Sequence, residues 1–501
     1  MGQSIAIVGS GICGMCTAMT LAGQGHDITV FDKDVSPPAG SAEEAFFSWE
    51  RRGAAQFRHP HAFLGLMCNL IEERYPELLD AFYAAGARRV DLQEMLPAEL
   101  RESYRPVRGD EKLWVLLCRR ATIETIIRQY VGALPGIRIV NPCKVTDLIT
   151  DSEGGRLQVK GLMIQREHEG EVTPFQADVV IDASGRRTRF PRWFAQRGCT
   201  IPEEKHDAEL VYYTRHYRLK EGRSEPARSD RSGAGDLGYL KFGVFPGDNG
   251  HFAIILCVPT PETAIRKAVR SGDLFDRICL SIPGLEPWLA DGRAEATTDP
   301  FGIGDINAVW RNFVRDGQPL AANFFAIGDA AVRTNPLYGR GCSTGLLHAS
   351  ILTDVLAETS DPVERALAFH QRTVSELRPI YDASLGEDRR GIKRATASMA
   401  GGLLEPPRTL RRWFALAFGD ALSAASREQA HVLRGALRSF HLLEKPGEFL
   451  NDWRIRRTVL RYMLRGRKRN ATMRLQPGPE RVELHELLGL QAPEPTAEPA
   501  P

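Results

Sequence analysis

The sequence is constrained most by a glycine-rich turn that joins a short apolar strand to a helix. Residues 4–8 are apolar and partly β-branched and predict a strand, and the turn that follows reads Val8-Gly9-Ser10-Gly11-Ile12-Cys13-Gly14. A helix from about Gly14 to Gly23 and a second strand, Asp27–Phe31, complete a βαβ unit. In such a unit the first glycine makes the tight turn, the second lets a phosphate approach the backbone, and the third lets helix and strand pack closely.

Asp32 supports a nucleotide-binding role for this turn. It closes the second strand 18 residues after Gly14, the position from which a carboxylate accepts ribose hydroxyls. The N-terminus of the helix also points free N–H groups at the phosphates. Strand, turn, helix and acid together predict a bound dinucleotide, whereas the glycines alone would also fit an ordinary tight turn.

Two further strand ends carry features of a cofactor site. A buried strand over Asn323–Ile327 runs into Gly328-Asp329-Ala330-Ala331, and Asn335-Pro336-Leu337-Tyr338-Gly339-Arg340-Gly341 leads to a helix expected over Cys342–Glu358. A carboxylate at a strand end can hold a ribityl hydroxyl, and a helix start presents N–H groups where negative charge develops on a reduced isoalloxazine. The strand Ala177–Ala183, followed by Ser184 and Gly185, is a third such piece and is unspecific by itself.

These three pieces, in this order and at these spacings, resemble the glutathione-reductase-type FAD proteins of the para-hydroxybenzoate hydroxylase class. These are the group A flavoprotein monooxygenases, with geranylgeranyl reductases, flavin-dependent halogenases and polyether-type epoxidases as relatives. The resemblance covers roughly residues 4–360. It implies an α/β fold: a three-layer ββα, Rossmann-like FAD-binding domain, a mixed β-sheet substrate domain and a helical C-terminal region.

The expected division of the chain follows from this resemblance and from hydrophobic periodicity. The FAD-binding domain would take residues 1–189 and 316–360, the substrate domain 190–315, the helical region 361–489 and a disordered tail 490–501. Helices are expected over residues 61–86, 120–134 and 262–271, strands over 137–140, 143–150, 156–165, 210–219, 239–246 and 251–259, and a loop over 221–237.

The resemblance also implies a set of residues that contact FAD. They are Gly9, Gly11, Ile12, Cys13, Gly14, Asp32, Lys33, Arg52, Arg120, Val145, Gly328, Asp329, Pro336, Gly339, Gly341, Cys342 and Ser343. The stretch Arg51–His61 resembles an R-x-G-x-x-Q-x-x-H-x-H segment that runs beside the flavin in epoxidase-like members. From it we take Arg58 and His61 as candidate catalytic residues without assigning either, and we expect no metal site. The alternative is that the histidines only begin the next helix and that Arg120 is a surface arginine.

The function implied is that of an FAD-dependent monooxygenase. Such an enzyme hydroxylates or epoxidises a small organic molecule, such as a secondary metabolite, through a flavin C4a-hydroperoxide, with NADPH or NADH as a transient reductant. A flavin reductase or a carrier protein could be a further partner. The alternatives are an FAD-dependent reductase or dehydrogenase of an isoprenoid or lipid, a flavin-dependent halogenase, and a protein that binds FAD without turnover. The tryptophan-halogenase W-x-W-x-I-P stretch is absent from the sequence.

Composition limits the partners and the compartment. The net charge of +2 gives no reason to expect a nucleic acid, and no apolar run reaches the roughly 18 residues of a membrane-spanning helix. The nine cysteines do not form a disulfide framework, and we interpret Cys13 and Cys16 as small packing residues. We therefore expect a cytoplasmic protein.

The C-terminal helices are basic: between Arg408 and Arg469, arginine and lysine outnumber the acids. We interpret these helices first as a packing element, with Trp413, Phe414, Leu416 and Phe418 on the buried side. A membrane surface or an acyl-carrier partner is the alternative.

Overall fold

The computed structural model describes residues 2–54, 56–153, 156–166, 170–401, 409–471 and 477–491. At its centre five parallel strands form a sheet in the order β22-β10-β1-β2-β6. The strands are β1 (Ser4–Val8), β2 (Asp27–Phe31), β6 (Ile137–Val140), β10 (Val179–Asp182) and β22 (Phe324–Ala326). Strand β1 lies in the middle of this sheet, and its Ile5, Ala6 and Ile7 are fully buried, as expected for a strand covered on both faces.

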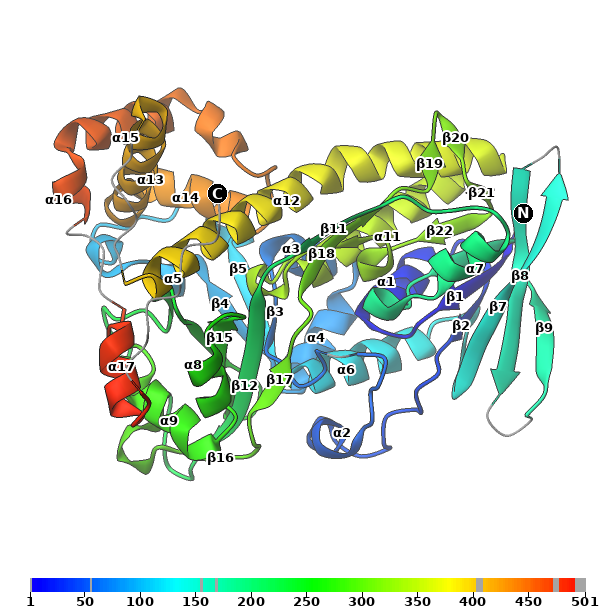
Figure 1. Cartoon of the computed structure of the whole chain (residues 1–501). Coiled ribbons are helices and arrows are strands. Elements are labelled where there is room, and N and C mark those ends of the chain that lie inside the picture. The colour runs from blue at the N-terminus through cyan, green and yellow to red at the C-terminus, as the bar shows by residue number, and fades with distance from the viewer. Residues whose placement is uncertain are drawn as a thin grey trace.

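Different layers cover the two faces of this sheet (Figure 1). One face carries α1 (Ile12–Leu21), α6 (Arg120–Gly132) and α11 (Gly341–Glu358). The other carries an antiparallel sheet of β7 (Cys143–Glu153), β8 (Arg156–Arg166) and β9 (Val172–Gln176), joined by β21 (Ala321–Ala322). This three-layer ββα arrangement confirms the fold class predicted from the sequence.

A second sheet lies beside the first three layers. Its strands are β12 (Leu210–Leu219), β13 (Ala234–Asp236), β14 (Lys241–Pro246), β15 (His251–Pro259), β16 (Ala294–Ala296) and β17 (Phe301–Ile303). All pairs are antiparallel. One face packs on α8 (Thr263–Ala268), α9 (Gly272–Leu280) and α10 (Glu286–Leu289). The other face is directed toward the parallel sheet, and a cavity lies between them.

The prediction of a single helix over residues 61–86 was wrong. The segment forms β3 (His61–Phe63), α3 (Gly65–Arg74) and α4 (Pro76–Ala84). Pro76 has no N–H to donate, so it ends the run and begins a new helix. Strand β3 pairs with β5 (Trp114–Cys118), and three residues are too few to show a β period in the sequence.

The remaining elements connect these layers and form the C-terminal part. The connecting elements are α2 (Ala42–Ser48), β4 (Arg88–Asp91), α5 (Leu92–Met95), α7 (Phe190–Gln196), β11 (Glu203–Asp207), β18 (Asn307–Arg311), β19 (Val314–Arg315), β20 (Gln318–Pro319) and β23 (Val332–Arg333). The C-terminal helices are α12 (Pro362–Met399), α13 (Leu410–Glu428), α14 (Ala430–Phe440), α15 (Trp453–Arg465), α16 (Arg467–Ala471) and α17 (Arg481–Leu487). None of the helices in the described ranges is long and apolar enough to cross a membrane. The predicted tail lies, beyond Gln491, outside the described residues.

We predict that Gly14→Ala destabilises the protein. A Cβ at this position of α1 would overlap the carbonyl oxygen of Gly9, and overpacking of this kind costs about 1–3 kcal/mol of unfolding free energy. Gly419→Ala in α13 is the matched control, because its Cβ would meet no atom within 4 Å and alanine favours a helix over glycine. Denaturant unfolding of both variants measures the difference, and an unchanged midpoint for Gly14→Ala would contradict the packing argument.

Candidate functional site

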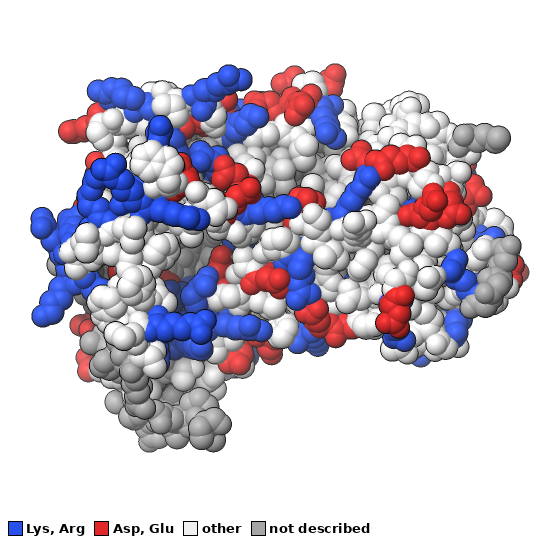
Figure 2. All heavy atoms as spheres, turned by 90° about the horizontal axis from the view of Figure 1, so that it is seen from above, with Lys and Arg blue, Asp and Glu red and all other residues white. Residues whose placement is uncertain are grey.

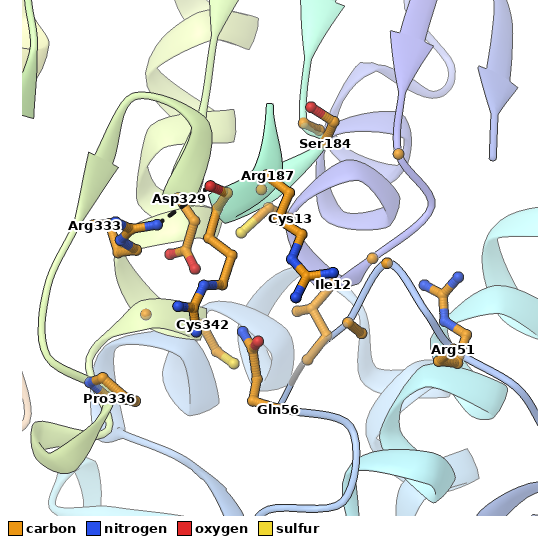
Figure 3. Close-up of a pocket in the computed structure, with 18 of the residues that line it drawn as sticks. Ile12, Cys13, Arg51, Gln56, Ser184, Arg187, Asp329, Arg333, Pro336 and Cys342 are labelled. Atoms are coloured by element: carbon orange, nitrogen blue, oxygen red, sulfur yellow. Dashed lines mark hydrogen bonds between the residues drawn. The ribbon is translucent and has the colours of Figure 1, made fainter. Parts of the chain in front are cut away.

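A cavity of about 370 Å³ lies where the parallel strands end (Figure 3). Its walls include Val8 of β1, Phe31 of β2 and Ala183 after β10. The carboxyl edge of an open parallel sheet is the place where ligands of α/β proteins bind. Gly9, Gly11, Ile12, Cys13, Asp32, Lys33, Arg120, Val145, Asp329, Pro336, Gly339, Gly341 and Cys342 of the predicted set line this cavity.

The three glycines of the turn have different environments. Gly11 lines the cavity, and a Cβ built on it would meet no atom within 4 Å. Gly9 has a φ of +106°, and a Cβ there would press on the carbonyl of Ala183. Gly14 does not line the cavity and packs against Gly9. Open space therefore faces Gly11 and the first turn of α1, which fits a pyrophosphate held by helix N–H groups.

Asp32 is held as a buried carboxylate at the edge of the cavity. One of its oxygens accepts hydrogen bonds from the Ser10 N–H (2.7 Å) and the Ser10 hydroxyl (2.5 Å), and the other from the Asp34 N–H (2.8 Å). Burial alone would raise the pKa of this carboxyl, but Arg51 and these hydrogen bonds outweigh it and the pKa is lowered. The group stays ionised, as a ribose-binding acid requires.

Arg51, not Arg52, is the arginine of this region that reaches the cavity. Its side chain is 3% exposed and forms ion pairs with Asp32 (3.2 Å), Asp34 (3.1 Å) and Glu124 (2.9 Å). Arg52, which the sequence predicts to contact the cofactor, is 81% exposed and, among the described residues, forms an ion pair only with Glu50. The arginine that opens the R-x-G-x-x-Q segment is Arg51, so the segment itself carried the signal that the sequence analysis missed.

His61 has no free ring nitrogen for proton transfer. Its Nδ1 donates to the carbonyl of His59 (2.8 Å), and its Nε2 accepts from Arg120 (2.8 Å). Burial, and then the Arg120 cation, lower the pKa of His61 well below its ordinary value, so the ring is neutral. His61 therefore holds Arg120, whose Nε donates to Glu124 at 2.6 Å.

Arg58, the other candidate, does not line the cavity. It donates to the carbonyl of Phe47 at 3.1 Å and lies over the ring of Phe301. The neighbouring His59 does line the cavity, but its Nδ1 is engaged with the hydroxyl of Thr214 at 2.8 Å. Judged from the described residues, neither candidate catalytic residue, Arg58 or His61, is placed to exchange a proton with a ligand.

Asp329 is an acceptor without a donor. It follows β22, lines the cavity, and accepts no hydrogen bond from any residue in the described part of the chain. Burial raises the pKa of this carboxyl, and Arg333 is the strongest influence in the opposite direction. Figure 3 shows both side chains at the same wall. A half-buried carboxylate that faces the cavity and has no donor among the described residues fits a ligand hydroxyl.

Gly328 and Ser343 lie behind the cavity wall. Gly328 has a φ of +55°, and a Cβ on it would press on the Cys13 thiol. Ser343 is fully buried below the first turn of α11, and its hydroxyl has no hydrogen-bond partner among the described residues. The turn before α11, by contrast, presents Pro336, Gly339, Gly341 and Cys342 to the cavity.

The far end of the cavity is apolar. Its wall consists of Tyr212, Phe245, Ile255, Ile303, Ile306 and Leu337. The face of β12 with Tyr212, Thr214 and His216 is therefore the one toward the cavity, while Tyr213 and Tyr217 pack on the helices. The Tyr212 hydroxyl donates a hydrogen bond to the side-chain oxygen of Asn335. The amide of Gln56 has no partner among the described residues and points into the cavity (Figure 3).

Helix α12 fastens the turn that flanks this chamber. Asp388 accepts hydrogen bonds from the Asn335 amide and the Tyr338 hydroxyl, both at 2.7 Å. Arg340 donates to the Ser384 hydroxyl at 2.7 Å and to Glu387 at 3.0 Å. The three α12 residues, Ser384, Glu387 and Asp388, lie within about one helical turn. They hold the loop against this helix, so the loop is set by α12 as much as by α11.

Besides Arg51, four arginines of the cavity wall were not in the predicted set. Arg186, Arg187 and Arg189 follow β10, and Arg333 is the last residue of β23. Arg187 points into the cavity (Figure 3). The first three follow the end of β10, the strand end that is unspecific by itself in the sequence. A position just after the carboxyl end of a buried parallel strand is the signal that could have identified them.

Comparison with known proteins agrees with this geometry. The family model of the NAD(P)-binding Rossmann-like domain matches residues 7–79. The chain is 24% identical over 468 residues to Protein Rv3254 of Mycobacterium tuberculosis, covering 87% of this chain and 89% of that protein. It is 23% identical over 472 residues to kynurenine 3-monooxygenase of Salinispora arenicola, covering 87% and 93%.

Solved structures share the fold at low identity. OxyS anhydrotetracycline hydroxylase from Streptomyces rimosus superposes with a TM-score of 0.55 at 15% identity, covering 89% of this chain and 76% of that one. The flavin-dependent brominase Bmp2 superposes with a TM-score of 0.57 at 15% identity, covering 93% and 100%. The chain therefore has the fold of flavin-dependent monooxygenases and halogenases, with a Rossmann-like nucleotide-binding part.

We predict that Arg51→Met lowers the unfolding free energy by about 3–5 kcal/mol, because it leaves buried carboxylates without their cation. The pKa values of Asp32 and Glu124 are lowered in the folded protein despite burial, Arg51 being the main cause. Such groups stabilise the fold above their unfolded pKa of about 4 and lose that contribution as the pH falls. The difference between variant and wild type should therefore be largest near neutral pH and shrink in acid.

Arg52→Met is the matched control, because the adjacent side chain is exposed. Its unfolding midpoint should equal that of the wild type within about 0.5 kcal/mol. Equal losses for the two variants, or a loss for Arg51→Met that does not change with pH, would contradict the assigned ion pairs.

Proposed function

We propose that this chain is an FAD-dependent monooxygenase that oxygenates a small, uncharged, apolar organic molecule. The observation that carries the proposal is one continuous cavity with two different ends. One end has the glycine turn, Asp32 and Asp329, and the other is lined mostly by apolar side chains, with Asp305 between Ile303 and Ile306. The similarity to a kynurenine 3-monooxygenase and the shared fold with a hydroxylase support the same class of reaction.

The residues that line the cavity fit FAD. Asp32, Lys33 and Val145 would hold the adenosine, Gly11 and the start of α1 the pyrophosphate, and Asp329 a ribityl hydroxyl. Pro336, Gly339 and Cys342 would flank the ring system. When bound and reduced, FAD supplies the electrons that activate molecular oxygen, with NADPH, NADH or a flavin reductase as the source of those electrons.

The protein's own groups would bind, orient and exclude water. The N-terminus of α11 faces the cavity at Gly341 and Cys342, where its N–H groups would stabilise negative charge on the ring. The wall of Phe245, Ile255 and Ile303 would keep water from the reacting atoms. Gln56 would give the substrate one hydrogen bond. With both nitrogens of His61 engaged, no role in proton transfer is assigned to it.

The thiols support a cytoplasmic location. Eight of the nine cysteines (Cys13, Cys16, Cys68, Cys118, Cys199, Cys257, Cys279 and Cys342) are free thiols, and most of these are buried, which suits a reducing compartment. Burial raises the pKa of the Cys13 and Cys16 thiols, so both stay protonated, in agreement with a packing role for this C-x-x-C pair.

We predict that Gly11→Ala and Asp329→Ala each weaken FAD binding by about tenfold to a hundredfold. Asp329→Ala would remove a charged acceptor of a ribityl hydrogen bond, and Gly11→Ala would put a methyl group into the space assigned to the pyrophosphate. Gly386→Ala and Asp354→Ala are matched controls away from the cavity. Flavin absorbance after desalting and titration calorimetry measure occupancy and affinity. Wild-type affinity in Gly11→Ala would show that the phosphates lie elsewhere.

We predict oxygen-dependent chemistry for the loaded protein. When the reduced protein is mixed with oxygen, isotopic label from oxygen gas should enter a product formed from an uncharged aromatic or polycyclic probe. NADPH consumption should respond to such probes more than to their carboxylated analogues. Conversion without oxygen would favour the reductase as the alternative. A bromide-dependent product would favour the halogenase, since this chain shares the fold of the brominase Bmp2.

A further inference from the structure

Helix α15 has two apolar faces, and only one of them packs against the part of the chain that the structure describes. Its inner face consists of Ile455, Thr458, Val459 and Tyr462, which are buried in a small core with α13 and α14. Met463 is partly buried against this core. The remaining apolar residues of the helix are Trp453, Leu460 and Leu464, which are 63%, 53% and 90% exposed. The packing role predicted for the C-terminal helices is therefore filled in α15 by its inner face, and the exposed apolar residues take no part in it.

Helical geometry places the exposed set on the opposite side of the helix. At 3.6 residues per turn, Trp453, Leu460 and Leu464 fall within an arc of about 40°, and this arc points about 180° away from the inner face. Arg457 and Arg461 lie next to them on one side and Arg456 on the other. We call Trp453, Arg457, Leu460, Arg461 and Leu464 the outer face of α15.

The cations of the outer face are not engaged in ion pairs. Arg457 and Arg461 form no ion pair with any residue in the described ranges, and α15 contains no acidic residue. The arginines that do serve packing are others: Arg465 pairs with Glu428 at 2.8 Å and Arg467 with Asp420 at 3.0 Å. Figure 2 shows lysines and arginines gathered at this end of the molecule, between uncharged side chains.

The adjacent helix α13 extends the same pattern. Its first turn carries Leu410, which is 87% exposed, and the exposed Trp413 and Phe414, with Arg411 and Arg412 between them. The sequence analysis placed Trp413 and Phe414 on a buried side, and that prediction was wrong. Helices α13 and α15 pack against each other, so both sets belong to one helical subdomain.

We propose that the outer face of α15 docks this protein on an anionic lipid surface. Tryptophan and leucine on one side of a helix, bordered by arginines, are typical of helices that lie in a membrane interface. A protein partner is less well suited, because three separated side chains on a convex helix offer far less than the roughly 800 Å² per partner of a stable protein interface. A few inserted side chains suffice for lipid contact when nearby cations add to it.

The docking proposal does not depend on the proposed reaction. The cavity and the outer face belong to different parts of the chain, and either assignment can fail without the other. If both hold, an apolar substrate could be taken from the lipid phase rather than from water.

Cosedimentation of the full-length holoprotein with vesicles tests the proposal. The protein should bind vesicles of phosphatidylcholine mixed with phosphatidylglycerol at about 0.15 M salt, more weakly at higher salt, and little to pure phosphatidylcholine. Each cation near such a surface contributes about fivefold to the partition coefficient, so Arg457→Gln/Arg461→Gln should lower it by roughly 25-fold. Trp453→Ala/Leu464→Ser should lower binding at least about tenfold, because both apolar contacts are lost.

Arg270→Gln/Leu280→Ser is the matched control, with an exposed arginine and an exposed leucine on the middle part of the chain. It should bind vesicles as the wild type does, and all variants should keep their FAD content and circular dichroism, because the changed side chains face solvent. Absence of binding to anionic vesicles, or equal binding by the Trp453→Ala/Leu464→Ser variant, would overturn the proposal. So would a concentration-dependent dimer in solution that the same two substitutions abolish, since a second copy would then be the occupant.

Discussion

The site depends on a buried network of charges at the edge of the parallel sheet. Arg51 contacts Asp32, Asp34 and Glu124, and Glu124 also accepts from Arg120. Arg128 joins it through the Ser10 hydroxyl at 2.7 Å. Three arginines and three acids are thus removed from water together, which is tolerable only when every charge has a partner. The network ties the glycine turn, the end of β2 and helix α6 to one another, and the floor of the cavity follows from it.

The fold could be predicted from the sequence because its strongest signals are local. The strand at 4–8, the turn at Gly9 to Gly14 and the strand Asp27–Phe31 need only neighbouring residues to be recognised, and β1 and β2 lie where they were expected. The prediction of one helix over 61–86 was wrong because part of this segment depends on a partner that is distant in the sequence. A three-residue strand such as β3 is stabilised by pairing with β5, which is more than fifty residues away in the sequence, and no local pattern records that partner. The domain boundaries stay a prediction.

The site was predictable in outline but not in which side chain faces inward. Backbone positions such as Gly11 and Asp329 are fixed by the end of a strand, so position along the chain is enough to locate them. Arg51 and Arg52 are neighbours of the same type, and only the three-dimensional arrangement of carboxylates decides which is buried. His61 illustrates a second limit. Its residue type suggests acid–base chemistry, but its two hydrogen bonds, one of them to an arginine from another helix, are not visible in the sequence.

The attachment of α12 to the loop beside the cavity changes how the C-terminal third of the chain should be regarded. Ser384, Glu387 and Asp388 hold residues of that loop from a helix that lies beyond residues 4–360, the stretch on which the sequence-based resemblance rests. A chain that stopped at residue 360 would keep every residue predicted to touch the cofactor and yet lack the contacts that hold the loop beside the apolar end of the cavity. The predicted cofactor contacts and the support of that loop thus lie in different stretches of this sequence, and a change in α12 can alter the cavity without touching a predicted cofactor contact.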